Sequence, residues 1–156
     1  MTHNRLILLV EDNADDVDLT LRAFERSQLL HKMVVARDGR EALEYLFAEG
    51  AFAGRDPDLA PELVLLDLNL PKLDGLDVLR RMRADERTNR IPVVILTSSR
   101  EEQDIVKSYN VGANSFVRKP VNSAEFLEAA RQLGIYWLDV NVNAASPAIR
   151  TKPLAK

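Results

Sequence analysis

The chain has 156 residues, 46% of them hydrophobic and 29% charged, with 21 Lys or Arg against 24 Asp or Glu and a net charge of −3. This composition is typical of one globular domain and excludes a disordered or fibrous chain. The near balance of charge argues against a nucleic-acid or membrane-surface protein, and the absence of cysteine excludes disulfides and thiolate metal sites. No apolar run is long enough to span a membrane and no secretory signal is recognisable, so we expect a cytoplasmic protein.

Five short apolar runs alternate with stretches of helical spacing, and this alternation predicts the fold. The runs cover residues 6–10, 33–36, 63–66, 93–96 and, more weakly, 115–117. They are rich in Val, Ile and Leu without alternating apolar and polar residues, which is typical of parallel strands buried on both faces. The helical stripes that follow the runs are Val17, Leu21, Phe24; Ala42, Leu43, Leu46, Phe47; Leu76, Leu79, Met82; Ile105, Val106, Tyr109; and Phe126, Leu127, Ala130, Leu133.

Helix starts are indicated at Asp38-Gly39, Asp74-Gly75, Ser98 or Ser99, and Ser123. Five β-α units in strict alternation predict an α/β fold, a doubly wound parallel sheet of order 2-1-3-4-5 with helices on both faces. Residues 50–61, rich in Gly, Pro and Ala, predict a surface loop, and residues 141–156 predict a polar tail. We therefore expect one domain over residues 1–140, an extension over 141–156 and no second, output domain.

Polar residues follow four of the predicted strands. They are Glu11 and Asp12 after the first, Asp67 and Asn69 after the third, Thr97 after the fourth, and Lys119 and Pro120 after the fifth. Ligands of open α/β sheets bind outside the carboxyl ends of the strands, so we expect these groups at one edge. Clustered carboxylates need a cation, and Mg²⁺ takes carboxylate and phosphate oxygens. A carboxylate can also accept a phosphoryl group, which hydroxyl and ammonium donors stabilise.

Each of these residues also has a structural interpretation. The acids within residues 11–18 would favour the N-terminus of a helix through its dipole. Asp67 would end a strand in a turn, Thr97 would cap a helix, and Lys119 would be a solvated surface lysine. If the residues had no joint function, all of these separate interpretations would have to hold together at the same edge of the sheet.

The segments ILLVEDN (7–13), LVLLDLNLPKLDG (63–75), PVVILTSS (92–99) and GANSFVRKP (112–120) resemble the receiver domain of bacterial response regulators, which has a flavodoxin-like fold. The resemblance covers residues 5 to about 138 and implies phosphorylation of Asp67. It implies Mg²⁺, or Mn²⁺ as a substitute, at Glu11, Asp12, Asp67 and the backbone carbonyl of Asn69. The other implied roles are a phosphoryl-binding hydroxyl and ammonium on Thr97 and Lys119, an aromatic switch at Phe116, and a cis Lys119-Pro120 bond. A buried Phe116 is also compatible with a role in the core alone.

The loop at 50–61 and the aromatic Tyr136-Trp137 are similar to single-domain regulators paired with phytochrome-type histidine kinases. This implies a histidine kinase partner of the bacteriophytochrome type. It also implies a homodimer through the fourth helix, fifth strand, fifth helix and C-terminal extension. The interface candidates are Ile105, Tyr109, Phe126, Ala130, Leu133, Trp137 and Val140. The last five follow 4-3-4-3 spacing, and this apolar face would be covered either by the tail or by a partner.

The resemblance implies a phosphoacceptor switch that is not an enzyme, apart from slow self-catalysed loss of its phosphoryl group. One alternative is a phosphohydrolase of the haloacid dehalogenase type. That class needs an acid two residues after the nucleophile, and Asn69 occupies this position. A second alternative is an interaction module with a purely structural acidic pocket, which would not be phosphorylated on Asp67.

Overall fold

The computed structural model describes residues 5–56 and 59–144, in which strands and helices alternate. The elements are β1 (Arg5–Val10), α1 (Ala14–Arg26), β2 (His31–Ala36), α2 (Gly39–Leu46), β3 (Leu63–Leu66), α3 (Gly75–Ala84), β4 (Val93–Thr97), α4 (Glu102–Val111), β5 (Ser115–Arg118) and α5 (Ser123–Ile135). A short 3-10 helix, η1 (Gly50–Phe52), precedes β3, and a π-helical turn, η2 (Tyr136–Val140), extends α5. None of these helices is long and apolar enough to cross a membrane.

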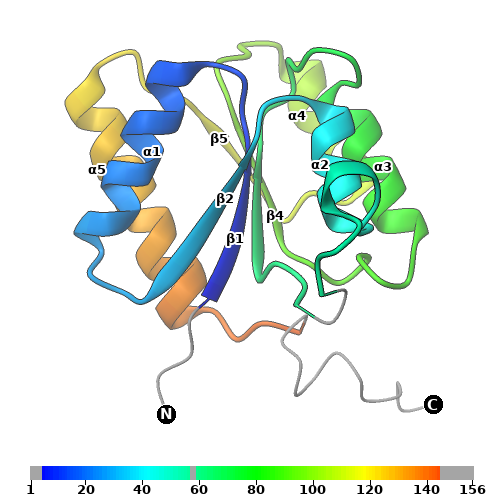
Figure 1. Cartoon of the computed structure of the whole chain (residues 1–156). Helices are drawn as coiled ribbons and strands as arrows, with labels where there is room; N and C mark the ends of the chain where they lie inside the picture. The colour runs from blue at the N-terminus through cyan, green and yellow to red at the C-terminus, as the bar shows by residue number, and fades with distance from the viewer. Residues whose placement is uncertain (1–4, 57–58, 145–156) are drawn as a thin grey trace.

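The five strands form one parallel sheet in the order β2-β1-β3-β4-β5. Helices α1 and α5 cover one face, and α2, α3 and α4 cover the other (Figure 1). The predicted doubly wound α/β fold and its strand order are thereby confirmed. The three central strands are apolar except for Arg5 at the start of β1 and Thr97 at the end of β4, because both of their faces are buried under helices.

The core consists of two layers, one on each face of the sheet. Leu8 and Val10 of β1 pack with residues of α2 and α3, whereas Ile7 and Leu9 pack toward Phe24 of α1. Successive strand residues point to opposite faces, so one short strand supplies both layers.

Side-chain caps fix most of the helix starts. Asp38 accepts from the N–H of Glu41 and Asp74 from that of Asp77, which confirms these two predicted starts. The predicted start of the last helix at Ser123 is confirmed, whereas the start at Ser98 or Ser99 was placed too early. Helix α4 follows Glu101 without a side-chain cap, and α5 is capped by Asn122, one residue before Ser123. An Asn side chain satisfies exposed helix N–H groups as well as Ser does, and here it accepts from two of them.

The loop between α2 and β3 is held by one arginine. The guanidinium group of Arg55 donates to the carbonyls of Tyr45 (2.8 Å) and Leu46 (3.1 Å), which lie at the C-terminus of α2. It also stacks on the Tyr45 ring at 4.6 Å. Residues 57–58 of the predicted loop, and residues 145–156 of the predicted tail, lie outside the described residues.

The apolar stripe of α5 is used differently from the prediction. Phe126 and Ala130 are buried with Ala23 of α1, so the prediction that they belong to an interface was wrong. The reason is that α1 and α5 pack side by side on the same face of the sheet (Figure 1). Leu133 and Trp137 are half-buried against the same side of the core.

One half-buried arginine joins three segments, and its removal should be costly. Arg83 of α3 donates to the carbonyls of Gly112 and Ile91, each at 2.9 Å, and to the side chain of Asn114. We expect Arg83→Met to lower the free energy of unfolding by about 2–3 kcal/mol, because bonds from a charged donor are lost and half-buried carbonyls lose their partner. Urea unfolding measures this. Arg81→Met, an exposed neighbour on the same helix, should stay within about 0.5 kcal/mol; equal effects of the two substitutions would contradict the prediction.

Candidate functional site

The carboxyl ends of four strands place polar residues next to one another. Val10 of β1 pairs with Leu66 of β3, and the N–H of Asp67 donates to the Val10 carbonyl at 3.1 Å. On the other side, the N–H of Lys119 donates to the carbonyl of Thr97 at 2.7 Å. The predicted site residues therefore follow directly on strands that are fixed in register, and the sheet brings them to one edge.

The ammonium group of Lys119 is the centre of this cluster. Its Nζ donates to Asp67 Oδ2 and Asp16 Oδ2, each at 2.9 Å, and to Glu11 Oε1. The Lys119 side chain is only 6% exposed, and those of Glu11 and Asp67 are equally buried. An ammonium group has three donor hydrogens, so these three carboxylates satisfy it completely.

Burial and charge act against each other at this cluster. Burial raises the pKa of Glu11 to about 7; its hydrogen bond from Lys119 opposes the rise, and the nearby Asp67 charge adds to it. For Lys119, burial by itself would lower the pKa, but its hydrogen bond with Glu11 and the attraction of Asp67 outweigh burial and raise it. Lys119 is therefore a fixed positive charge, whereas the carboxylates around it remain partly uncompensated.

Three carboxylates at the edge can share a cation. Glu11, Asp12 and Asp67 each offer an oxygen, and these oxygens lie within 4.8 Å of one another. Glu11 and Asp67 are buried and Asp12 is exposed, which leaves one side of the group open to solvent. Hard oxygen donors with an open side suit Mg²⁺, which keeps several of its waters. The residues present therefore fit the divalent metal that the resemblance implies.

The loop after Asp67 is held close to the site by backbone contacts. The N–H of Asn69 donates to Asp67 Oδ1 at 3.2 Å, and the N–H of Gly75 donates to the carbonyl of Leu68 at 2.9 Å. A Cβ on Gly75 would lie 2.2 Å from the Asp67 carbonyl oxygen. Only glycine allows α3 to begin so close to the strand end.

The remaining predicted residues lie beside this cluster. Thr97 is fully buried at the end of β4, and its Oγ1 accepts a hydrogen bond from the N–H of Ser99 at 3.3 Å. Phe116 is half-buried against the core layer of α2 and α3, and its N–H donates to the Tyr109 hydroxyl at 3.1 Å. Phe116 thus contacts both the core and helix α4.

The Lys119-Pro120 bond is trans, since the described residues contain no cis peptide bond. The expectation of a cis bond here was wrong. The trans form is intrinsically favoured by about 0.5–1 kcal/mol before proline.

Asp16 was not predicted to belong to the site. It lies in the first turn of α1, and the sequence only indicated that acids favour a helix start there. Asp16 is the third residue of α1, which begins at Ala14 directly after the strand end, so its side chain lies within reach of the strand-end groups.

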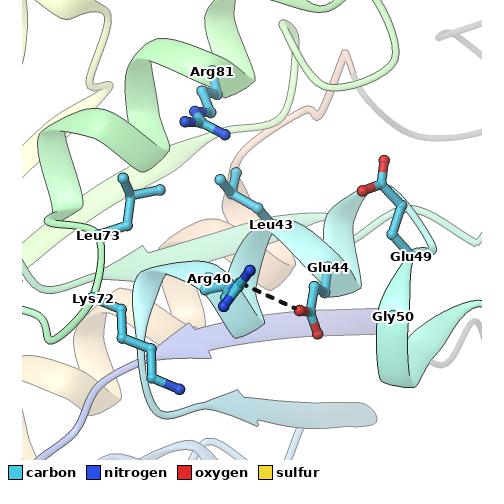
Figure 2. A pocket seen from close by; sticks show the side chains of 8 residues that line it. All are labelled: Arg40, Leu43, Glu44, Glu49, Gly50, Lys72, Leu73 and Arg81. Atoms are coloured by element: carbon cyan, nitrogen blue, oxygen red, sulfur yellow. Dashed lines mark ion pairs between the residues drawn. The ribbon is translucent and has the colours of Figure 1, made fainter.

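A separate pocket of about 480 Å³ lies between α2 and the segments around α3 (Figure 2). Its walls carry charges of both signs: Arg40 pairs with Glu44, and Arg81 and Glu49 also line the pocket. Lys72 also lines it and pairs with Asp38, the cap of α2, at 3.5 Å. None of the predicted phosphorylation or metal-site residues lines this pocket.

Both the sequence and the structure are similar to those of known proteins. The sequence profile described as "Response regulator receiver domain" matches residues 7–131. The response regulator Rcp1 of Synechocystis sp. is 35% identical over 135 residues, which are 86% of this chain and 90% of Rcp1. A structure of its Mn²⁺-bound form has a TM-score of 0.84 at 34% identity and covers 89% of this chain and 98% of that one.

Two further solved structures are similar. That of the phosphorylated cyanobacterial phytochrome response regulator RcpA has a TM-score of 0.85 at 38% identity, covering 90% of this chain and 99% of that one. That of the bacteriophytochrome response regulator AtBRR has a TM-score of 0.70 at 53% identity, covering 86% and 96%. The matched region includes all the strand-end residues described above.

Proposed function

The chain belongs to the response regulator receiver domain family, and we propose that it accepts a phosphoryl group from a histidine kinase on Asp67. The observation that carries this proposal is the buried Asp67 carboxylate, 2.9 Å from the Lys119 ammonium group, beside two acids that follow β1. A purely structural acidic pocket would need the Lys119 ammonium group to offset its charge, but not an additional set of divalent-metal donors, open to solvent, around the same carboxylate.

In the proposed reaction, an Asp67 carboxylate oxygen attacks the phosphorus of a phosphohistidine. A P–O bond forms as the P–N bond breaks, and the kinase imidazole leaves as the neutral base after taking up a proton. Lys119 donates a hydrogen bond to a phosphoryl oxygen and keeps its proton, and the Thr97 hydroxyl supplies a second donor. A Mg²⁺ ion, held by Glu11, Asp12, Asp67 and the Asn69 carbonyl, would neutralise charge on the phosphoryl oxygens. The Mn²⁺-bound form of Rcp1 supports this choice of metal.

The signal would leave the site through Thr97 and Phe116. When the Thr97 hydroxyl turns to the phosphoryl group it gives up its bond with the Ser99 N–H, and Phe116 repacks between the core and α4. Phosphorylation thereby shifts the population between two arrangements of the face formed by α4, β5 and α5. The protein would act as a cytoplasmic receiver domain over residues 1–140 with an extension over 141–156, and not as an enzyme.

The kinase is proposed to be of the phytochrome type. The similar proteins RcpA and AtBRR are described as phytochrome and bacteriophytochrome response regulators, which supports this assignment.

A haloacid-dehalogenase-type hydrolase is disfavoured by Asn69, because an amide cannot protonate a leaving group.

A homodimer through α4, β5, α5 and η2 is also proposed. Tyr109, Tyr136 and Val140 are 49%, 49% and 61% exposed on this side, where a groove of about 510 Å³ lies between β5 and α5. Ile105 is half-buried on α4 and completes the candidate surface. Light scattering should give twice the chain mass, and Tyr136→Glu should give the monomer. A monomeric native protein would contradict the dimer without touching the phosphoryl-transfer proposal.

Intact mass after incubation with acetyl phosphate tests the function. With Mg²⁺, the native protein should gain one phosphoryl group, and Asp67→Asn should gain none. No gain by the native protein, either with acetyl phosphate or with beryllofluoride as a stable mimic, would favour the interaction-module alternative. Rapid phosphate release from many small phosphate esters would instead favour the hydrolase.

Removal of one carboxylate of the cluster should weaken Mg²⁺ binding without lowering the stability of the metal-free protein. We expect Mg²⁺ to raise the Tm of the native protein, because it binds the folded state, and EDTA to reverse the rise. Asp12→Asn should abolish most of this shift while leaving the metal-free protein as stable as before or more so, since it relieves repulsion. Thermal melts with and without Mg²⁺ measure both effects. Asp15→Asn, an exposed acid outside the cluster, is the control and should keep the full shift.

A further inference from the structure

Lys119 contacts one carboxylate that is not part of the metal-binding group. Asp16 Oδ2 lies 2.9 Å from Lys119 Nζ, and its side chain is 25% exposed in the first turn of α1. The other two partners, Glu11 and Asp67, both belong to the group that can share a cation. We propose that Asp16 is a positioning residue that holds the Lys119 ammonium group in place for phosphoryl transfer to Asp67. This inference rests on the proposed function.

The three contacts of Lys119 respond differently when a cation binds at the site and when Asp67 is phosphorylated. A divalent cation at Glu11 and Asp67 would draw on the negative charge of both carboxylates and repel the ammonium group. When Asp67 accepts the phosphoryl group, one of its oxygens becomes part of the new P–O bond. Asp16 takes part in neither event, so it keeps its full charge toward Lys119 throughout the reaction.

The local structure around Asp16 makes it a rigid anchor. Its backbone N–H donates to the Asn13 side chain at 3.0 Å, and its carbonyl accepts from the Thr20 hydroxyl at 2.7 Å. The N–H of Asn13 in turn donates to Glu11 Oε2 at 3.2 Å. The start of α1 is thereby connected to the strand end, and Asp16 is held at a fixed distance from the ammonium group. A short side chain on a backbone that is held by hydrogen bonds has few orientations to lose, so it orients its partner at low entropic cost.

A competing interpretation gives Asp16 only an electrostatic role. Asp15 and Asp16 are both acids in the first turn of α1, where they would stabilise the helix dipole. If that were the whole role, neutralising Asp16 would remove a negative charge beside the incoming phosphoryl donor and would speed phosphoryl transfer. The positioning role predicts the opposite direction, because Lys119 would lose the one partner that remains available to it.

The test compares Asp16→Asn with Asp15→Asn, which makes the same change in charge one residue away, where no side-chain contact with Lys119 exists. Intact mass would follow phosphorylation by acetyl phosphate with saturating Mg²⁺; there the P–O bond of the donor breaks and acetate leaves. We expect Asp16→Asn to slow the reaction about tenfold, as loss of an orienting partner does, and Asp15→Asn to change it less than twofold. The Mg²⁺ affinity, measured by calorimetry, should change less than twofold in both.

Asp16→Glu keeps the carboxylate and should recover at least part of the rate, which a purely structural role would not require. An Asp16→Asn protein that is phosphorylated as fast as Asp15→Asn, or faster, would overturn the positioning role and leave the proposed function intact. If the native protein gained no phosphoryl group under the same conditions, the proposed function would fail, and this inference with it.

Discussion

Gly75→Ala is expected to lower the free energy of unfolding by about 2–3 kcal/mol and to slow phosphoryl uptake on Asp67 at least tenfold. The added Cβ would meet the Asp67 carbonyl oxygen at 2.2 Å and the Leu68 Cα at 2.8 Å. Both are backbone atoms, so no change of rotamer can relieve the overlap. Either the start of α3 or the Asp67 backbone must move, and a displacement of about 1 Å at a reacting group is enough to cost this much in rate.

Gly54→Ala is the matched control for this substitution. A Cβ at position 54 has no atom within 4 Å. This variant should unfold within about 1 kcal/mol of the native protein and be phosphorylated at the native rate. Urea unfolding and intact mass measure the two quantities. Native behaviour of Gly75→Ala in both would show that α3 can withdraw from Asp67 without cost.

Lys119→Met is expected to lower the free energy of unfolding of the metal-free protein by about 3 kcal/mol, because removing one member of a buried ion pair leaves its partner uncompensated. Here two buried carboxylates, Glu11 and Asp67, would face each other without the ammonium group. Methionine matches the stem of the lysine in length, so the loss reports charge more than packing. Phosphoryl uptake should also fall, since the donor to the phosphoryl oxygens is gone.

Mg²⁺ should reverse part of this loss. A cation at Glu11, Asp12 and Asp67 supplies the positive charge that the variant lacks, so the stabilisation by Mg²⁺ should be larger in Lys119→Met than in the native protein. Urea unfolding in EDTA and in Mg²⁺ measures it. Lys72→Met removes an exposed lysine that also pairs with an acid, and should cost less than about 1 kcal/mol. A Lys119→Met protein as stable as the native one in EDTA would contradict the expected role of the ammonium group.

The sequence determined the fold because the local signals agree with one another. Five short apolar runs without alternation require a sheet that is covered on both faces. The connections between the runs have the length and spacing of helical crossovers between parallel strands. The strand-end residues were predictable for the same reason. In a parallel sheet the carboxyl ends share one edge, so Asp67, Thr97 and Lys119 had to come close together once the strands were recognised.

The contacts beyond this edge depend on which helices lie side by side. Phe126 and Ala130 form an apolar stripe that looks unpaired in the sequence, but they pack with Ala23 of α1, far earlier in the chain. Arg83 reads as one of several arginines on a polar helix face, but it joins α3 to the segments before β4 and β5. Neither contact has a local signal, because each joins residues whose distance is set only when two helices dock on the same face.

Sequence therefore determined the sheet, its order and the set of groups at its carboxyl edge, since periodicity and strand ends are local properties. The tertiary structure decided which acidic side chains contact the Lys119 ammonium group. The packing of α1 beside α5 brings Asp16 within 2.9 Å of Lys119, and the same docking buries the stripe predicted to be an interface. Coulomb energy and burial depend on distances in space, and those distances exist only after the helices have packed.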